Sequence, residues 1–141
     1  MNIELVTITE QNKHLLTDFI CNMGNSVDTF RYFQKRDLSC LKNHVISYLL
    51  LEKQKPIAYG HLDKEGENIW LGVCVIEAKT GHGLGNRMMT HLIDFAQQNK
   101  ISKIRLSVDK VNTNAIKMYN KFGFNQNRID KNIVFMDLDI A

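Results

Sequence analysis

The sequence predicts one mixed α/β domain with a mostly antiparallel central sheet that is flanked by helices. A chain of 141 residues has the size of a single domain. Three strand-like segments, 44–52, 56–62 and 68–76, are separated by short turn-like intervals, which favours antiparallel hairpins. A helical segment, 83–99, and a further strand, 101–108, follow, and such a strand–helix–strand crossover is normally parallel and right-handed.

The N-terminal part predicts a strand and then several helices. Apolar residues alternate over 2–8, which is typical of a strand, whereas over 10–22 they recur on one helical face. The stretch 22–25 contains Gly24 and ends that helix. Residues 27–43 predict one or two short helices.

The C-terminal part predicts two helices and a final hairpin. The helix over 83–99 carries one apolar stripe, and a shorter helix over 112–121 is closed by a glycine. Residues 124–128 and 132–138 predict the hairpin. We therefore expect one domain over 1–141.

Composition narrows the functional classes. Lysine and arginine number 18 against 15 acidic residues, and this net charge of +3 is too small and too scattered to favour nucleic-acid binding. Cys21, Cys40 and Cys74 show no metal-site spacing and suggest thiols in a reducing compartment. No signal-peptide pattern and no apolar run of about 20 residues occurs. We expect a cytoplasmic protein, monomer or homodimer, that binds neither a membrane nor a metal.

A glycine-rich turn is the most informative motif. Gly81, Gly83 and Gly85 lie between a buried strand and a long amphipathic helix. Glycines let a ligand approach the backbone closely, and the unpaired N–H groups at a helix start suit a phosphate. The dinucleotide pattern GxGxxG fails at Asn86 and Met88, and no Gly-Lys-Ser/Thr occurs. A turn that only reverses the chain is the simpler alternative, but it does not need three glycines.

Two motifs resemble those of the GNAT N-acetyltransferase superfamily. The run TGHGLG over 80–85 resembles its pyrophosphate loop, R/Q-x-x-G-x-G/A. The segment 112–124 is similar to N-x-x-A-x-x-x-Y-x-x-x-G-F. The resemblance covers 44–128 well and the residues before 44 only by element order. It implies the acyl-CoA N-acyltransferase fold, with neighbouring parallel central strands that splay apart.

The resemblance implies that acetyl-CoA is the co-substrate, bound where strands 69–76 and 102–108 separate, without a metal. The pyrophosphate would lie on backbone amides of the glycine-rich turn, and the pantetheine arm would pair with the strand. Gly72, within that strand, suits either a bulge that opens the splay or simple packing. The implied cofactor-binding residues are Val73, Val75, Thr80, Gly81, His82, Gly83, Leu84, Gly85, Asn86 and Asn112.

One position departs from the family pattern. Thr80 stands where arginine or glutamine is usual. Its hydroxyl and N–H can form hydrogen bonds to a phosphate oxygen, but the side chain brings no positive charge. Lys79, His82 or Arg87 are candidates to supply the charge, and each is also explained as a solvated surface residue. Cofactor binding is expected to persist, in weaker form.

Acetyl transfer needs an oxyanion donor, an acid for the leaving thiolate and a route for the amine proton. By resemblance, a backbone N–H near Val75 is the oxyanion donor and Tyr119 is the general acid, although Tyr119 also suits plain packing. His61 is the catalytic candidate for the base, with Asp63 and Glu77 as alternatives, and a packed strand histidine is the simpler explanation. The lack of a carboxylate on strand 70–75 favours an amine of low pKa.

The acceptor is predicted from the segment 27–36, which the resemblance places over the acceptor site. Arg31 and Arg36 there suit an anion, and the aromatic residues nearby suit a sugar or base. Tyr59 shares a strand face with His61 and completes the expected substrate-binding set. The pattern favours a small anionic amine, an amino-sugar nucleotide or an amino acid, although an amphipathic helix with solvated arginines also explains it.

The function that these residues favour is an N-acetyltransferase that acts by direct attack of a primary amine in a ternary complex. One alternative is a protein acetyltransferase for lysine or an N-terminus, which a flat acidic cleft would favour. Another is a non-catalytic acyl-CoA-binding regulatory module, which the uncharged Thr80 fits and the retained Tyr119 opposes.

Overall fold

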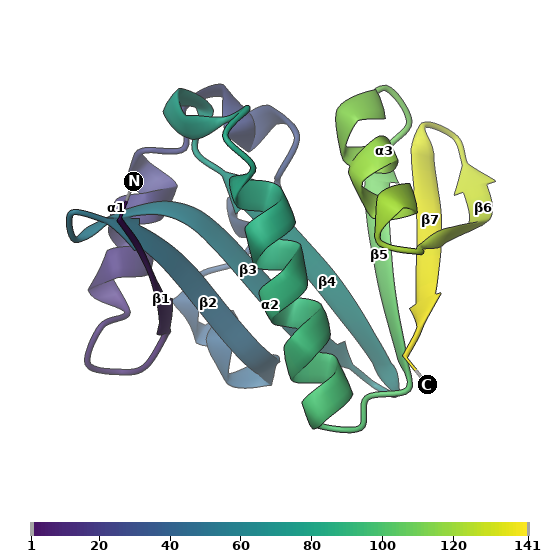
Figure 1. Ribbon diagram of the computed structural model, residues 1–141, viewed down its shortest axis with the longest axis horizontal. Coiled ribbons are helices and arrows are strands. Elements are labelled where there is room, and N and C mark those ends of the chain that lie inside the picture. The colour runs from purple at the N-terminus through teal and green to yellow at the C-terminus, as the bar shows by residue number, and fades with distance from the viewer. Residues whose placement is uncertain (1, 141) are drawn as a thin grey trace.

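The computed structural model describes residues 2–140 and shows one seven-stranded sheet in the order β1-β2-β3-β4-β5-β7-β6 (Figure 1). Each neighbouring pair is antiparallel except β4 and β5, which are parallel. The predicted fold class is confirmed. The strands are β1 (Ile3–Thr7), β2 (His44–Glu52), β3 (Lys55–Glu65), β4 (Asn68–Val75), β5 (Lys103–Asp109), β6 (Asn125–Asp130) and β7 (Ile133–Asp139).

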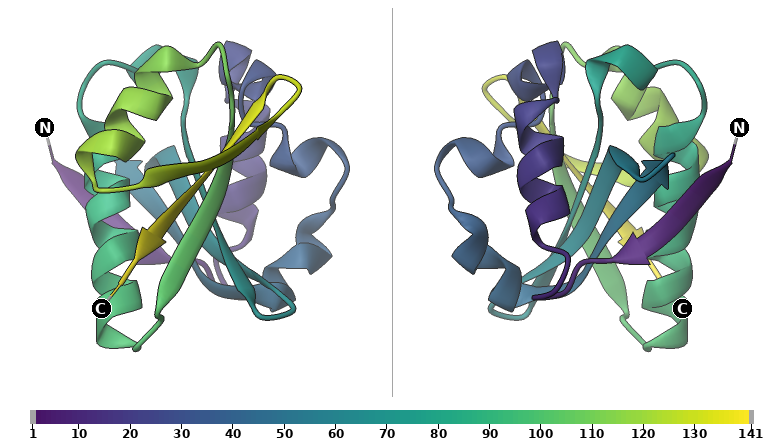
Figure 2. Two further views of the ribbon diagram at one scale, coloured as in Figure 1. Left: turned by 90° about the vertical axis from the view of Figure 1, so that its right-hand side faces the viewer. Right: turned by 90° about the vertical axis from the view of Figure 1, so that its left-hand side faces the viewer.

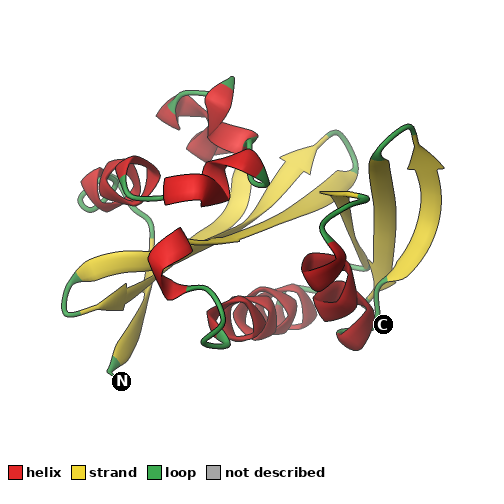
Figure 3. Ribbon diagram, turned by 90° about the horizontal axis from the view of Figure 1, so that it is seen from above, coloured by secondary structure: helices red, strands yellow, loops and turns green. Residues whose placement is uncertain are grey.

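Helices cover both faces of the sheet (Figure 3). The helices α2 (Leu84–Gln98) and α3 (Thr113–Lys121) lie on one face, and α1 (His14–Cys21) lies on the other. Figure 2 shows α1 and β1 at one side of the molecule and α3 with the β6–β7 hairpin at the opposite side. The apolar stripe of α2 is buried against β3 and β4 through Met88 and Leu92, so the long helix holds the centre of the sheet.

The parallel strands β4 and β5 meet at one end and then diverge (Figure 1). Their only register pair within the described residues is Trp70 with Arg105. In contrast, β3 and β4 stay paired from Ala58–Val75 to Glu65–Asn68. The second half of β4 therefore leaves backbone groups on its β5 side without a neighbouring strand, as the sequence predicted.

The segment after α1 differs only in detail from the one or two short helices predicted. It forms three separate 3₁₀ helices, η1 (Gly24–Asp28), η2 (Tyr32–Gln34) and η3 (Leu38–Asn43). A fourth, η4 (Glu77–Lys79), follows β4. Such turns are anchored by contacts with the rest of the chain, because a 3₁₀ helix has poorer hydrogen bonds than an α-helix.

Gly72 serves packing and not a bulge. The β3–β4 register runs through Gly72 without interruption, with His61 as its partner. A Cβ atom at position 72 would lie 2.5 Å from His61 Nε2. The glycine therefore makes room for the imidazole of His61. Among the described helices, none is long and apolar enough to cross a membrane.

Candidate active site

A cleft of about 910 Å³ opens where β4 and β5 separate. Its walls come from the η1–η2 segment, β3, β4, the start of α2, the end of β5, α3 and β7. Residues from the two halves of the sheet thus face a common space, and most of the sequence-predicted site residues line it.

The glycine-rich turn forms one end of the cleft. Gly81 and Gly83 have φ angles of +83° and +78°, and a Cβ atom at either position would meet nothing within 4 Å. The first N–H groups of any α-helix have no intrahelical acceptor. Gly83 is the N-cap of α2 and provides no side-chain acceptor for them. Asn86, in the first turn of α2, also lines the cleft. This open, donor-rich surface fits a phosphate group.

The side chains that were candidates to bind a phosphate at this turn are either paired with other residues or lie outside the cleft. The hydroxyl and the N–H of Thr80 both point to the carbonyl of Glu77, at 3.0 and 3.3 Å, instead of toward the cleft. Lys79 lines the cleft but pairs with Glu52 at 2.7 Å. His82 and Arg87 are exposed and do not line the cleft. The surface at this end of the cleft therefore presents mainly backbone groups.

Val73, Val75 and Asn112 also line the cleft. Val73 and Val75 line the cleft from β4, beyond the last β5 pairing. Ser26 donates a hydrogen bond of 2.7 Å to the carbonyl of Val75, so that acceptor already has one partner. Asn112 lines the cleft and caps α3 by accepting from the N–H of Ala115 at 3.3 Å.

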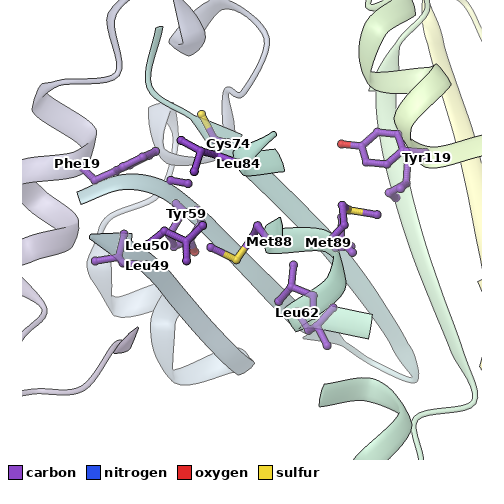
Figure 4. Close-up of a cluster of buried hydrophobic side chains, with 14 of the residues drawn as sticks. Phe19, Leu49, Leu50, Tyr59, Leu62, Cys74, Leu84, Met88, Met89 and Tyr119 are labelled. Carbon is purple, nitrogen blue, oxygen red and sulfur yellow. The ribbon is translucent and has the colours of Figure 1, made fainter. Parts of the chain in front are cut away.

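Tyr119 reaches the cleft from α3. It is only 7% exposed, and its hydroxyl is directed away from α3 toward the side of β4 and α2 (Figure 4). Burial raises the pKa of Tyr119 to about 12, with the nearby Cys74 as a smaller cause. The phenol therefore keeps its proton at neutral pH, as a general acid must.

His61 lines the cleft from β3 and is 2% exposed. Its Nδ1 forms a hydrogen bond of 2.7 Å with the Tyr59 hydroxyl, and its Nε2 lies above Gly72. Burial lowers the pKa of His61 well below its ordinary value, so the ring is neutral at pH 7. Tyr59 is fully buried and does not line the cleft, so the structure makes it the partner of His61 and not a wall of the acceptor site.

A second polar cluster beside His61 contains Asp63, an alternative base that also lines the cleft, but the sequence did not predict its partners Tyr32 and His44. The Tyr32 hydroxyl donates to Asp63 Oδ2 at 2.8 Å and lies 2.7 Å from His44 Nε2. The His44 and His61 rings lie 4.4 Å apart, and burial lowers the pKa of His44. Because these residues come from η2, β2 and β3, only tertiary structure brings them together.

The two predicted acceptor arginines differ in their surroundings. Arg31 forms a two-point ion pair with Asp109 at the end of β5, with both distances 2.8 Å. Arg36 stacks over the Tyr32 ring at 4.2 Å and forms no ion pair with another described residue. Glu77, an alternative base, instead accepts from the N–H of Asn25 at 2.7 Å, outside the cleft lining.

The comparisons agree with this geometry. A family model described as the acetyltransferase (GNAT) family matches residues 12–124. No sequence among the curated proteins matches the chain.

No cluster of His, Cys, Asp or Glu that could hold a metal ion occurs within residues 2–140.

Three solved structures illustrate the shared fold. The GNAT domain of S. lividans PAT has a TM-score of 0.83 at 16% identity, over 97% of this chain and 90% of that chain. The Salmonella typhimurium protein yncA, solved with its cofactor acetyl-CoA, has a TM-score of 0.78 at 15% identity, over 100% and 95%. The PaiA N-acetyltransferase of Thermoplasma acidophilum, in complex with coenzyme A, has a TM-score of 0.76 at 12% identity, over 99% of both. Since the family match also spans most of the sequence, the chain belongs to the GNAT acetyltransferase family.

Proposed function

We propose that the chain transfers the acetyl group of acetyl-CoA to the primary amine of a small acceptor, by direct attack in a ternary complex. The observation that carries this proposal is the placement of His61 and Tyr119. His61 comes from β3 and Tyr119 from α3, which follows β5, and both line one cleft with the uncapped start of α2. This arrangement supports a reaction in which His61 acts as the base, Tyr119 acts as the acid and the start of α2 binds the phosphates.

The residues around the turn fit acetyl-CoA. The N–H groups at the start of α2, with Gly81 and Gly83, would hold the pyrophosphate. The unpaired side of β4 at Val73 and Val75 would hold the pantetheine arm as an added strand. When bound, acetyl-CoA supplies an activated thioester, and everything else in the reaction is the task of the chain.

Each catalytic residue has a defined proton task. His61 Nε2 would accept the proton of the acceptor amine, which requires that Nδ1 carries the ring hydrogen and donates it to Tyr59. Tyr119 would give its proton to the departing sulfur, and a backbone N–H near Val75 would stabilise the oxyanion. A histidine with a lowered pKa is a weak base, so we infer an amine that is partly neutral at pH 7.

The acceptor is proposed to be a small anionic amine, such as an amino-sugar nucleotide or an amino acid. Arg36 supports this, because its guanidinium lines the cleft without a carboxylate partner in the described chain. Arg31 supports it less, because Asp109 already occupies its two terminal nitrogens. A non-catalytic acyl-CoA-binding module is the alternative that Thr80 favours, since neither of its donors faces the cleft.

Calorimetric titration with acetyl-CoA tests the cofactor site. Gly83→Asp places a carboxylate where the phosphate would lie, and we expect it to abolish binding that the unmodified protein shows. Gly66→Asp is the matched control, because Gly66 also has a positive φ (+62°) and open space but lies outside the cleft. If both variants bind acetyl-CoA equally well, the phosphate does not lie on this turn.

Amine-dependent release of the CoA thiol tests catalysis. Tyr119→Phe removes the acid and is expected to lower kcat by roughly 10²-fold or more, with acetyl-CoA affinity unchanged. Tyr48→Phe, on β2 outside the cleft lining, is the control and should keep full activity. Binding of acetyl-CoA without turnover of any amine would instead favour the non-catalytic module.

A further inference from the structure

A second cavity of about 300 Å³ adjoins the cleft on the sheet face opposite α2. It shares Trp70 and Phe135 with the cleft, and its other walls include Arg105 and Arg128. We propose that this cavity is an anion subsite of the acceptor, which binds a carboxylate or phosphate group linked to the reacting amine by a short chain. This inference rests on the proposed function, because the cleft must hold the amine.

The charges that line this cavity favour an anion. Its one carboxylate, Asp137, already accepts from Arg105 at 3.4 Å and from Asn127 at 2.8 Å. Arg128 lies over the Phe135 ring at 4.1 Å and forms no ion pair with another residue of the described chain. Two guanidinium groups thus face one carboxylate, which leaves Arg128 available for an anionic ligand.

Trp70 forms part of the wall that the two cavities share. Its ring packs edge-on against the Phe135 ring, with the ring centroids 6.3 Å apart. Because Arg128 lies over the same Phe135 ring, an anion bound by Arg128 would lie near the indole.

The sheet register places Trp70 close to His61. Gly72 is the partner of His61, and Trp70 lies two residues before Gly72 on β4, which is about 7 Å along the strand. Arg128 lies farther along the sheet, on β6. Asp63, the cross-strand partner of Trp70, lines the cleft but not the second cavity.

The chain's single tryptophan makes the subsite visible without turnover. Glycylglycine has an amine and a carboxylate about 7 Å apart when extended, and its amide differs only in lacking the negative charge. We expect glycylglycine, and separately inorganic phosphate, to change the Trp70 fluorescence in a saturable way. The uncharged amide should bind at least about tenfold more weakly.

Arg128→Gln is expected to weaken binding of glycylglycine by at least about tenfold. Lys131→Gln removes the same charge from the same hairpin outside both cavities and should change nothing. Equal binding of acid and amide, or an unchanged affinity in Arg128→Gln, would overturn the subsite. If the unmodified protein binds glycylglycine but does not bind acetyl-CoA, the proposed function is refuted and the anion site stands.

Discussion

His61 shows how a single buried residue depends on its neighbours. Its ring fits because Gly72 lacks a side chain, and Tyr59 supplies the hydrogen bond that a buried imidazole needs. The alternation of β3 predicted that Tyr59 and His61 share one face, and this is confirmed. The role of Gly72 could not be predicted, since a close approach across two strands leaves no local pattern.

The lowered pKa of His61 has a consequence for stability. In the unfolded chain His61 would protonate near its ordinary pKa of about 6.5, while burial keeps it neutral in the folded protein. The unfolded state therefore binds more protons below pH 6.5, and the free energy of unfolding falls as the pH drops through this range. His61→Gln is expected to remove part of this fall, which denaturant unfolding between pH 7 and pH 5 measures.

In His61→Gln, the free energy of unfolding should still fall somewhat between pH 7 and pH 5. We assign this remaining fall to His44, because burial also lowers the pKa of His44. His14→Gln, an exposed position on α1, is the control and should keep the pH dependence of the unmodified protein. A pH dependence that is identical in His61→Gln and the unmodified protein would contradict the buried neutral state.

At the scale of elements, periodicity predicted what local sequence determines. The stripe of α2, the motif of α3 and the hairpins around β3 formed as expected. The region of η1 to η3 was predicted as short helices, but their number and type were not, because distant residues hold the region in place: Glu77 binds Asn25, and Asp109 binds Arg31. A partner 78 positions away along the chain cannot be inferred from spacing.

The Arg31–Asp109 ion pair joins the η1–η2 segment to the end of β5, and both residues line the cleft. The pair is partly exposed, so Asp109→Asn and Arg31→Gln should each lower the free energy of unfolding by no more than about 1 kcal/mol. Both should raise the acceptor KM to a similar extent, because each releases the same contact.

A double-mutant cycle separates this structural role from direct acceptor binding. If the ion pair only holds the two segments together, the acceptor KM of the double variant should be no higher than that of either single variant. A much larger KM effect of Arg31→Gln than of Asp109→Asn would show that Arg31 itself contacts the acceptor, as the sequence suggested.

At the scale of the whole molecule, the sheet consists of two halves joined by one short parallel contact. Beyond Trp70 and Arg105, the side of β4 that faces β5 has no partner strand. The family resemblance, carried by the two motifs, implied this splay, whereas the order of the elements alone indicated only a mixed α/β domain. The β4–β5 contact is therefore the weakest connection in the sheet, and the cleft lies beside it.

A ligand that fills the cleft should accordingly stabilise the whole domain. At about 100 times its Kd, acetyl-CoA would add about 2.7 kcal/mol, which corresponds to a rise in Tm of roughly 5–10 °C for a chain of this size. Hydrogen exchange should slow most in β4 and β5, because an added pantetheine strand occupies the open edge between them. Gly83→Asp should show neither effect. A rise in Tm with slowed exchange confined to β1 and β2 would place the ligand elsewhere, because those strands lie at the far edge of the sheet from the split.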